Sequence, residues 1–542
     1  MRKYIVVILC LIFTTLFLYT TKSDFPLIFQ KDLLAHDESS NSVVAANITR
    51  KFFPPMVRVN PLNPEQGNWM EGPYWQHIPP LFAYVPYLFF KLDGQVTIEV
   101  KRLSFAFLTW LTGLLFILVV YKYKDSLLAA LAASIAAILW IRTPFTHELI
   151  TGYAFGVSDI VLAFTVVASF GAILWYLREE RGERNNYRYR KLILIGLIVA
   201  LPILAKNLLG AIPAATFLIL LLIDHRKLNT KVIAAGISFL SLLVLYYLPL
   251  YLVSLATFKS EILVSFLHFK QLEGWGRPWH WYLTNYLPQR YLFRWTWVYY
   301  LGQLLSVIFS LKFSILKDRK DKVLFWLAFG WFAWNLLAIS LVTSKVPNFI
   351  YQTYLLSLFA IVYSIFLFIP IPHLMRDASK VLPKGIIAIL IISILITGYE
   401  AVRFGQQFQV QRAQAYNYNT DHEKLYRAAE QMRTQGAKQN DLVLVDVFKD
   451  DCWARYYILF LTGAESKTLL EMHFGNYPPE AFQKYRNIYF LKSDFTFEKF
   501  DTNKLNELLQ SKQPEIADEI SRVKKDKTSC QWLVPDPVLN AP

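Results

Sequence analysis

Uncharged, mostly apolar stretches recur along roughly the first four hundred residues, and most are long enough to cross a bilayer as a helix. The first, Tyr4–Thr21, is followed by no Ala-x-Ala-like cleavage site, so we interpret it as an uncleaved anchor. Pro79–Phe90 is also apolar, but at about a dozen residues it is too short to span, and we expect it in the membrane interface. We predict eleven transmembrane helices: Tyr4–Thr21, Leu103–Tyr121, Ser126–Ile141, Leu149–Leu177, two short helices made by dividing Leu192–Ile223 at Lys206, Val232–Phe258, Trp295–Leu311, Val323–Ser344, Val346–Leu374 and Gly385–Tyr399.

Basic residues cluster in alternate loops between these helices. If the chain is threaded from a cytoplasmic N-terminus, all the clusters fall on one side, as the positive-inside rule requires. An odd number of spans then places the C-terminus outside, which predicts a multi-pass protein of the cytoplasmic (inner) membrane. The clusters are Arg2-Lys3, Lys122 with Lys124, Arg178–Lys191, Arg226 with Lys227 and Lys231, Lys317–Lys322, and Arg376 with Lys380 and Lys384.

Two long segments face the outer side in this arrangement. One is the first loop, residues 22–101, and the other is the tail, residues 401–542. The tail alternates helical and strand patterns, which is typical of a small α/β domain. We therefore predict a transmembrane domain over residues 1–400 and an extracytoplasmic α/β domain over 401–542. The expected tail elements are helices at Asp421–Thr434 and Lys504–Ser511, and strands at Leu442–Val447, Ile488–Lys492 and Gln531–Val534.

Composition and charge support this membrane interpretation. Of 542 residues, 55% are hydrophobic and 18% charged, whereas soluble domains carry about 25% charged residues. The net charge of +16 arises outside the tail, which has 19 basic and 19 acidic residues, so nucleic-acid binding is not indicated. No Gly-rich phosphate-binding motif supports a nucleotide site. Cys452 and Cys530 both fall in the tail, where oxidation is permitted, and either form a disulfide or remain two unrelated thiols.

An adjacent pair of acids opens the first loop. Asp37 and Glu38 follow the first predicted helix by about fifteen residues, at a position close to the membrane surface. Such acids can orient or deprotonate an incoming hydroxyl group. The alternative is an ordinary helix cap, with Asp37 preceding a helical run over Ser42–Arg50. The two roles do not exclude each other.

Further ionisable side chains are predicted at or near the outer ends of the helices. Their burial in a membrane is costly, so they are candidates for function, although a single cation there is also explained by snorkelling. Together, three cations and two acids on one face suit a phosphate-bearing lipid and a hydroxyl-bearing partner. His77 could contact a phosphate or a metal, but a lone histidine is more often structural. The candidates besides Asp37 and Glu38 are His77, Asp159, Lys206, Arg277 and Lys345.

These residues, in this order, resemble the GT-C-fold glycosyltransferases of the protein-mannosyltransferase and aminoarabinose-transferase type. The matching positions extend over about Ala35–Gln352, and the tail resembles the outer soluble domain of the aminoarabinose-transferase branch. At one position the chain departs from the family: Ile78 stands where a lysine often precedes the two prolines, with His77 one place earlier. The matches are Asp37-Glu38, Pro79-Pro80-Leu81 followed by Arg102, Asp159, Lys206-Asn207, the stretch His268–Trp281, and Ser344–Asn348 with Tyr351.

The resemblance implies that a sugar is transferred from a polyprenyl-phosphate donor to lipid A, another envelope glycan or a protein, at the outer face of the membrane. Asp37 would orient or deprotonate the acceptor, and Asp159 would hold the acceptor or a second polar contact. Lys206, Arg277 and Lys345 would balance the departing lipid phosphate. The fold class admits a divalent metal, but the sequence offers no ligand cluster strong enough to assign one.

Two other classes of protein remain open. A transporter or flippase of a lipid-linked or anionic substrate also places charges in the membrane, but it should show paired repeats and broken helices in both halves. The sequence contains no internal repeat and concentrates its polar groups on one face. A purely structural anchor for the tail would leave the charges within the membrane unexplained.

Overall fold

The computed structural model resolves the chain into two compact units. The helical unit comprises Met1–Ile28, Arg102–Pro249 and Leu263–Ala415, and the sheet unit comprises Phe29–Lys101, Leu250–Ile262 and Tyr416–Pro542. The tail is therefore grouped with the first loop. The structure describes residues 2–22, 28–29, 36–62, 74–75, 79–143, 146–147, 150, 157–178, 189–225, 230–255, 258–259, 277–286, 296–312, 318–342, 351–368, 420–446, 455–475, 477, 479–500 and 504–526.

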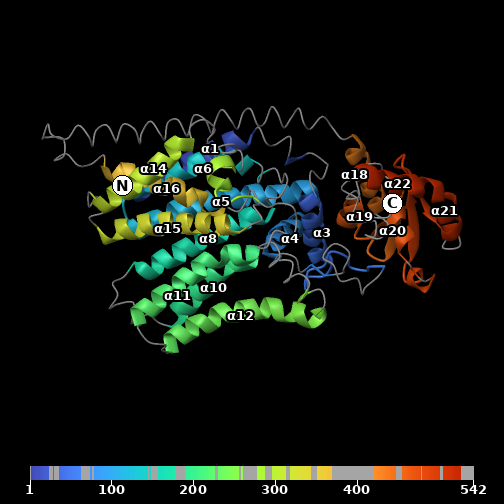
Figure 1. Ribbon diagram of the computed structural model, residues 1–542, viewed down its shortest axis with the longest axis horizontal. Helices are drawn as coiled ribbons and strands as arrows, with labels where there is room; N and C mark the ends of the chain where they lie inside the picture. The colour runs from blue at the N-terminus through green and yellow to red at the C-terminus, as the bar shows by residue number, and fades with distance from the viewer. Residues whose placement is uncertain are drawn as a thin grey trace. The chain divides into compact units, whose positions relative to one another are not determined.

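The helical unit is a bundle whose main helices run in nearly a common direction (Figure 1). Six helices within the described residues are long and apolar enough to cross a bilayer, with α10 and α11 taken together, and α6 and α16 are shorter apolar helices. Ten of the eleven predicted segments are present as helices; the last, Gly385–Tyr399, lies outside the described residues. The helices are α1 (Arg2–Thr21), α5 (Ile98–Lys124), α6 (Leu127–Ile141), α8 (Val157–Leu177), α10 (Tyr189–Lys206), α11 (Ala211–His225), α12 (Thr230–Val253), α14 (Thr296–Lys312), α15 (Arg319–Leu341) and α16 (Tyr351–Phe368).

Small residues allow the centre of this bundle to pack closely. Helix α6 buries six alanines and packs against both α1 and α16. Since lipid tails are as apolar as leucine, helices in a membrane gain from close backbone approach at small residues. The alanine-rich face of α6 therefore places the N-terminal end of α16 near the C-terminal end of α6.

Helices α10 and α11 form a hairpin around the short turn η2 (Asn207–Gly210). Pro202 inside α10 has no N–H for the carbonyl of Ile198, and the Ser169 hydroxyl of α8 donates a hydrogen bond of 3.2 Å to that carbonyl instead. At the turn, a Cβ on Gly210 would lie 2.0 Å from the Pro202 carbonyl oxygen. Glycine is thus required for the chain to reverse here, and the predicted division at Lys206 is confirmed.

The sheet unit contains a four-stranded sheet in the order β2-β1-β3-β4. Strand β1 (Asp441–Val445) pairs in parallel with β2 (Glu465–Thr468) and β3 (Asn487–Leu491), and β3 pairs antiparallel with β4 (Phe497–Phe500). The remaining elements are α18 (Thr420–Thr434), α19 (Arg455–Thr462), α20 (Leu469–Phe474), the 3-10 turn η9 (Pro479–Phe482), α21 (Leu505–Ser511) and α22 (Gln513–Asp526).

Four of the five predicted tail elements are confirmed, as α18, β1, β3 and α21. The predicted strand Gln531–Val534 lies outside the described residues, as do Cys452 and Cys530. Strands β2 and β4 were not predicted. The small α/β domain predicted for the tail is present.

The first loop contributes two helices to the sheet unit, α3 (His36–Arg50) and α4 (Leu81–Asp93). Helix α4 begins after Pro80, ends at Gly94 with φ of 80°, and corresponds to the predicted interfacial segment. Leu62, after α3, is buried in the same apolar core as Leu442 and Ile488 of the sheet. First loop and tail therefore share one core.

Candidate active site

The end of the helical unit where α8 begins and α10 ends carries a buried ion pair. Lys206, the last residue of α10, binds the carboxylate of Asp159, which lies in the first turn of α8. The side chain of Asp159 is 1% exposed and that of Lys206 is 12% exposed. A charge at membrane depth persists only with a partner, so this pair explains why each ion is tolerated. The Lys206 side chain therefore remains partly accessible.

The backbone after Lys206 is unusual. Asn207 has φ of 50°, in the left-handed region that residues other than glycine rarely adopt. Its side-chain oxygen accepts a hydrogen bond of 2.8 Å from the Tyr247 hydroxyl of α12. This bond holds the strained turn, and with it the end of α10 that carries Lys206.

Tyr351, the first residue of α16, lies at the same end of the unit. Its ring stacks on Trp140 of α6, with centroids 5.6 Å apart and planes at 30°. Its hydroxyl lies 3.4 Å from that of Thr146, and Tyr351 is close enough to Asp159 to interact with it electrostatically. Three predicted residues, Asp159, Lys206 and Tyr351, are thus brought together. Trp140 and Thr146 were not among the predicted residues. Trp140 lies inside an apolar run, where one more aromatic side chain carries no separate signal.

The other predicted residues are placed as follows. Arg102 is buried in α5, and Arg277 is exposed. Asp37 and Glu38 are the second and third residues of α3, so Asp37 lies within the helix rather than before it. His77 and Lys345 lie outside the described residues.

Metal ligands do not gather in the described part of the chain: no group of three or more His, Cys, Asp or Glu side chains there could hold a metal ion.

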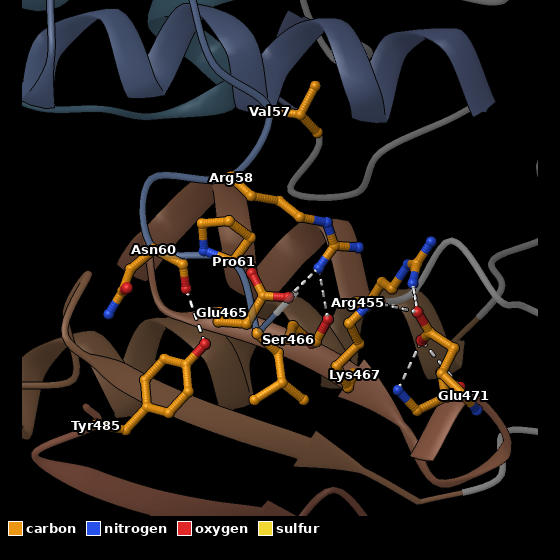
Figure 2. Close-up of polar contacts among 12 residues, drawn as sticks. Val57, Arg58, Asn60, Pro61, Arg455, Glu465, Ser466, Lys467, Glu471 and Tyr485 are labelled. Carbon is orange, nitrogen blue, oxygen red and sulfur yellow. Dashed lines mark hydrogen bonds and ion pairs between the residues drawn. The ribbon is translucent and has the colours of Figure 1, made fainter. Parts of the chain in front are cut away.

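A second set of buried charges lies in the sheet unit (Figure 2). Arg58, in the first loop, is 0% exposed and binds Glu465 of β2; it also donates a hydrogen bond of 3.2 Å to the Ser466 carbonyl. Beside it, Glu471 binds Arg455 and also binds Lys467 at 3.2 Å. This network has no signal in the sequence, since polar residues in a loop and in a short polar strand have the pattern of solvated positions.

Comparison with solved structures identifies the fold of this chain. No protein-family model and no curated protein matches the sequence. Among solved structures, ArnT from Cupriavidus metallidurans bound to undecaprenyl phosphate is similar, with a TM-score of 0.53 and 12% identity over 85% of each chain. The apo state of that ArnT has a TM-score of 0.51 and 13% identity, covering 90% of this chain and 93% of the other. The archaeal oligosaccharyltransferase AglB from Archaeoglobus fulgidus, in complex with an inhibitory peptide and a dolichol-phosphate, has a TM-score of 0.51 and 12% identity, covering 90% and 69%.

The chain has the GT-C fold. The predicted fold class, a polytopic α-helical membrane protein with a small C-terminal α/β domain, is confirmed.

Proposed function

We propose that this protein is a membrane glycosyltransferase that moves a sugar from a polyprenyl-phosphate donor to an acceptor at the outer face of the cytoplasmic membrane. The acceptor is lipid A, another envelope glycan or a protein. The GT-C fold supports this proposal, because similar solved structures contain undecaprenyl phosphate or dolichol-phosphate.

The observation that carries the proposal is the partly accessible side chain of Lys206, whose ammonium group binds Asp159. When a glycosyl–phosphate bond breaks, the departing lipid phosphate gains negative charge. A fixed cation in a low-dielectric site stabilises that charge strongly, and a cation already oriented by a carboxylate needs little reorganisation. In this proposal Lys206, Arg277 and Lys345 bind the phosphate, His77, Arg102 and Tyr351 complete the substrate site, and Asp159 orients Lys206.

We assign the acceptor side to the first turn of α3. Asp37, with Glu38 beside it, would orient or deprotonate the acceptor hydroxyl, which then attacks the sugar carbon as the lipid phosphate leaves. Removal of a general base lowers rates by about 10²–10⁴-fold.

The test is sugar transfer from polyprenyl-phosphate sugars by purified protein, with Asp37→Asn as the decisive variant. Asparagine keeps the shape of the side chain and removes its charge, so transfer should fall by about 10²–10⁴-fold without loss of folding. Asp93→Asn, at the exposed end of α4, is the matched control and should transfer normally. Near-normal turnover by Asp37→Asn would contradict the base role and leave a residue that only stabilises the helix end.

The sidedness is tested separately. A reporter that is active only in the cytoplasm, fused after Val402, should stay silent, because the alternation of basic loops predicts that the tail is outside. Strong reporter activity would mean that the tail lies in the cytoplasm. It would contradict the proposal that transfer takes place at the outer face. Comparison of envelope glycolipids and glycoproteins by mass spectrometry, with and without the gene, would identify the acceptor.

A further inference from the structure

The last residue of α3, Arg50, is bound by the C-terminal turn of α19. Its Nη1 donates to the Leu459 carbonyl at 3.3 Å, and its Nη2 donates to the Phe460 carbonyl at 3.0 Å. Carbonyls at a helix C-terminus form the negative end of the helix dipole and attract a cation. Burial and the nearby charge of Arg433 lower the pKa of Arg50 to about 10, so the guanidinium is still protonated at neutral pH.

Arg50 also controls a second contact through Asn47. Its Nη1 donates to Asn47 Oδ1 at 2.6 Å, which leaves Asn47 Nδ2 to donate to the carbonyls of Met56 and Val57, at 3.2 and 2.8 Å. The chain returning from α3 is thereby fixed, and its next residue, Arg58, binds Glu465. Figure 2 shows Arg58 reaching from this returning segment to the edge strand.

The fit around Arg50 depends on Gly463, directly after α19. This glycine has φ of 75°, and a Cβ at this position would lie 2.6 Å from Arg50 Nε and 2.7 Å from its Cζ. Gly436 offers a matched comparison. It also has positive φ, at 89°, but a Cβ there would meet nothing within 4 Å.

We propose that Arg50 is a positioning residue, and that the tail, by binding Arg50 through α19, sets the placement of the acid pair in the first turn of α3. This inference rests on the proposed function. Helix α3 has 15 residues, so it is about 22 Å long, and a tilt of about 3° at Arg50 displaces its first turn by about 1 Å. A displacement of about 1 Å at a reacting group can lower the rate by about 10²-fold.

The experiment compares Gly463→Ala with Gly436→Ala in the full-length protein. Both place alanine at positive φ, but only Gly463→Ala displaces the Arg50 guanidinium. We expect kcat for sugar transfer to fall about 10- to 100-fold in Gly463→Ala, with an unchanged KM for the lipid donor. Gly436→Ala should keep both constants. Arg50→Lys, which retains the charge and a donor, should lose less activity than Arg50→Met.

A second measurement is independent of the sugar chemistry. Hydrogen exchange of the α3 amides should be faster in Gly463→Ala than in the wild type and unchanged in Gly436→Ala. If the wild type transfers no sugar, the proposed function fails, while hydrogen exchange still decides whether α19 fixes α3. Equal kcat and equal exchange in the two glycine variants would overturn the positioning role. If Gly463→Ala does not fold, equal kcat in Arg50→Lys and Arg50→Met would overturn it.

Discussion

Arg58–Glu465 in the sheet unit and Asp159–Lys206 in the helical unit are buried ion pairs that join distant parts of the chain, and they differ in accessibility. Arg58 and Glu465 are separated by 407 residues and both side chains are 0% exposed. Asp159 and Lys206 are separated by 47 residues, and Lys206 keeps 12% exposure. Arg58 also donates to a backbone carbonyl, that of Ser466, whereas Lys206 directly precedes the left-handed backbone of Asn207.

Burial of a charge therefore does not by itself indicate chemistry. A closed pair such as Arg58–Glu465 joins two segments, and its loss should appear in stability. A pair with a reachable cation and a strained neighbouring backbone can act on a ligand, and its loss should appear mainly in turnover. Four substitutions test this distinction.

The largest effect is expected for Arg58→Met, which leaves the Glu465 carboxylate buried without its cation. Breaking a buried pair from one side costs about 3–5 kcal/mol, so the melting temperature of the purified protein should fall markedly. Arg427→Met, which breaks an exposed pair with Glu423, is the control and should cost about 0.5 kcal/mol or less. The double change Arg58→Met with Glu465→Met should recover much of the loss; no recovery would mean that the pair is not what links loop and tail.

Lys206→Met should lower the turnover of the enzyme more than its stability. Removing one fixed group that stabilises developing negative charge lowers kcat by about 10²–10³-fold, or about 2.7–4 kcal/mol in the barrier. Lys191→Met changes a lysine at the other end of the same helix, where it contacts the Trp175 ring at 4.7 Å, and should transfer normally. Equal activities in these two variants would mean that Asp159–Lys206 is only a structural contact, as Arg58–Glu465 is.

Gly210→Ala tests the turn that carries Lys206. The added Cβ overlaps the Pro202 backbone, so the hairpin must shift, and overpacking of this kind costs about 1–3 kcal/mol. Thermal melting should detect the loss. In Gly236→Ala, within α12, the Cβ would meet nothing within 4 Å, so melting should be unchanged or slightly higher.

The smallest effect is expected for Tyr247→Phe, which removes the hydrogen bond to Asn207. Loss of one such bond costs about 1 kcal/mol, so melting should decrease slightly. Tyr251→Phe, one turn later on an exposed part of α12, is the control. A Tyr247→Phe protein that melts like the control would show that the left-handed turn is held by other contacts.

Most transmembrane helices could be predicted because an uncharged run in a membrane has few alternatives, and Lys206 revealed the hairpin because a lone charge interrupts such a run. Strand β2 could not be predicted. Its sequence, Glu-Ser-Lys-Thr, has the polarity of a surface turn, yet all four residues are buried. Strand β1 and helices α19 and α20 pack against it, and Arg58 binds Glu465 and the Ser466 carbonyl. Arg58 comes from a segment about four hundred residues earlier, which no local pattern contains. The same limit applies to Tyr351, whose stacking on Trp140 depends on the packing of α6 with α16.

The hydrogen bonds of Asn47 have a practical consequence for producing the protein. Asn47-Ile48-Thr49 is an acceptor sequence for N-linked glycosylation, which attaches a glycan to Nδ2. In the folded protein that nitrogen donates to two carbonyls and Asn47 is 1% exposed, so the glycan and the native packing exclude each other. A host that glycosylates secreted chains before they fold would therefore trap this segment in a non-native state. A bacterial host without that modification avoids the conflict.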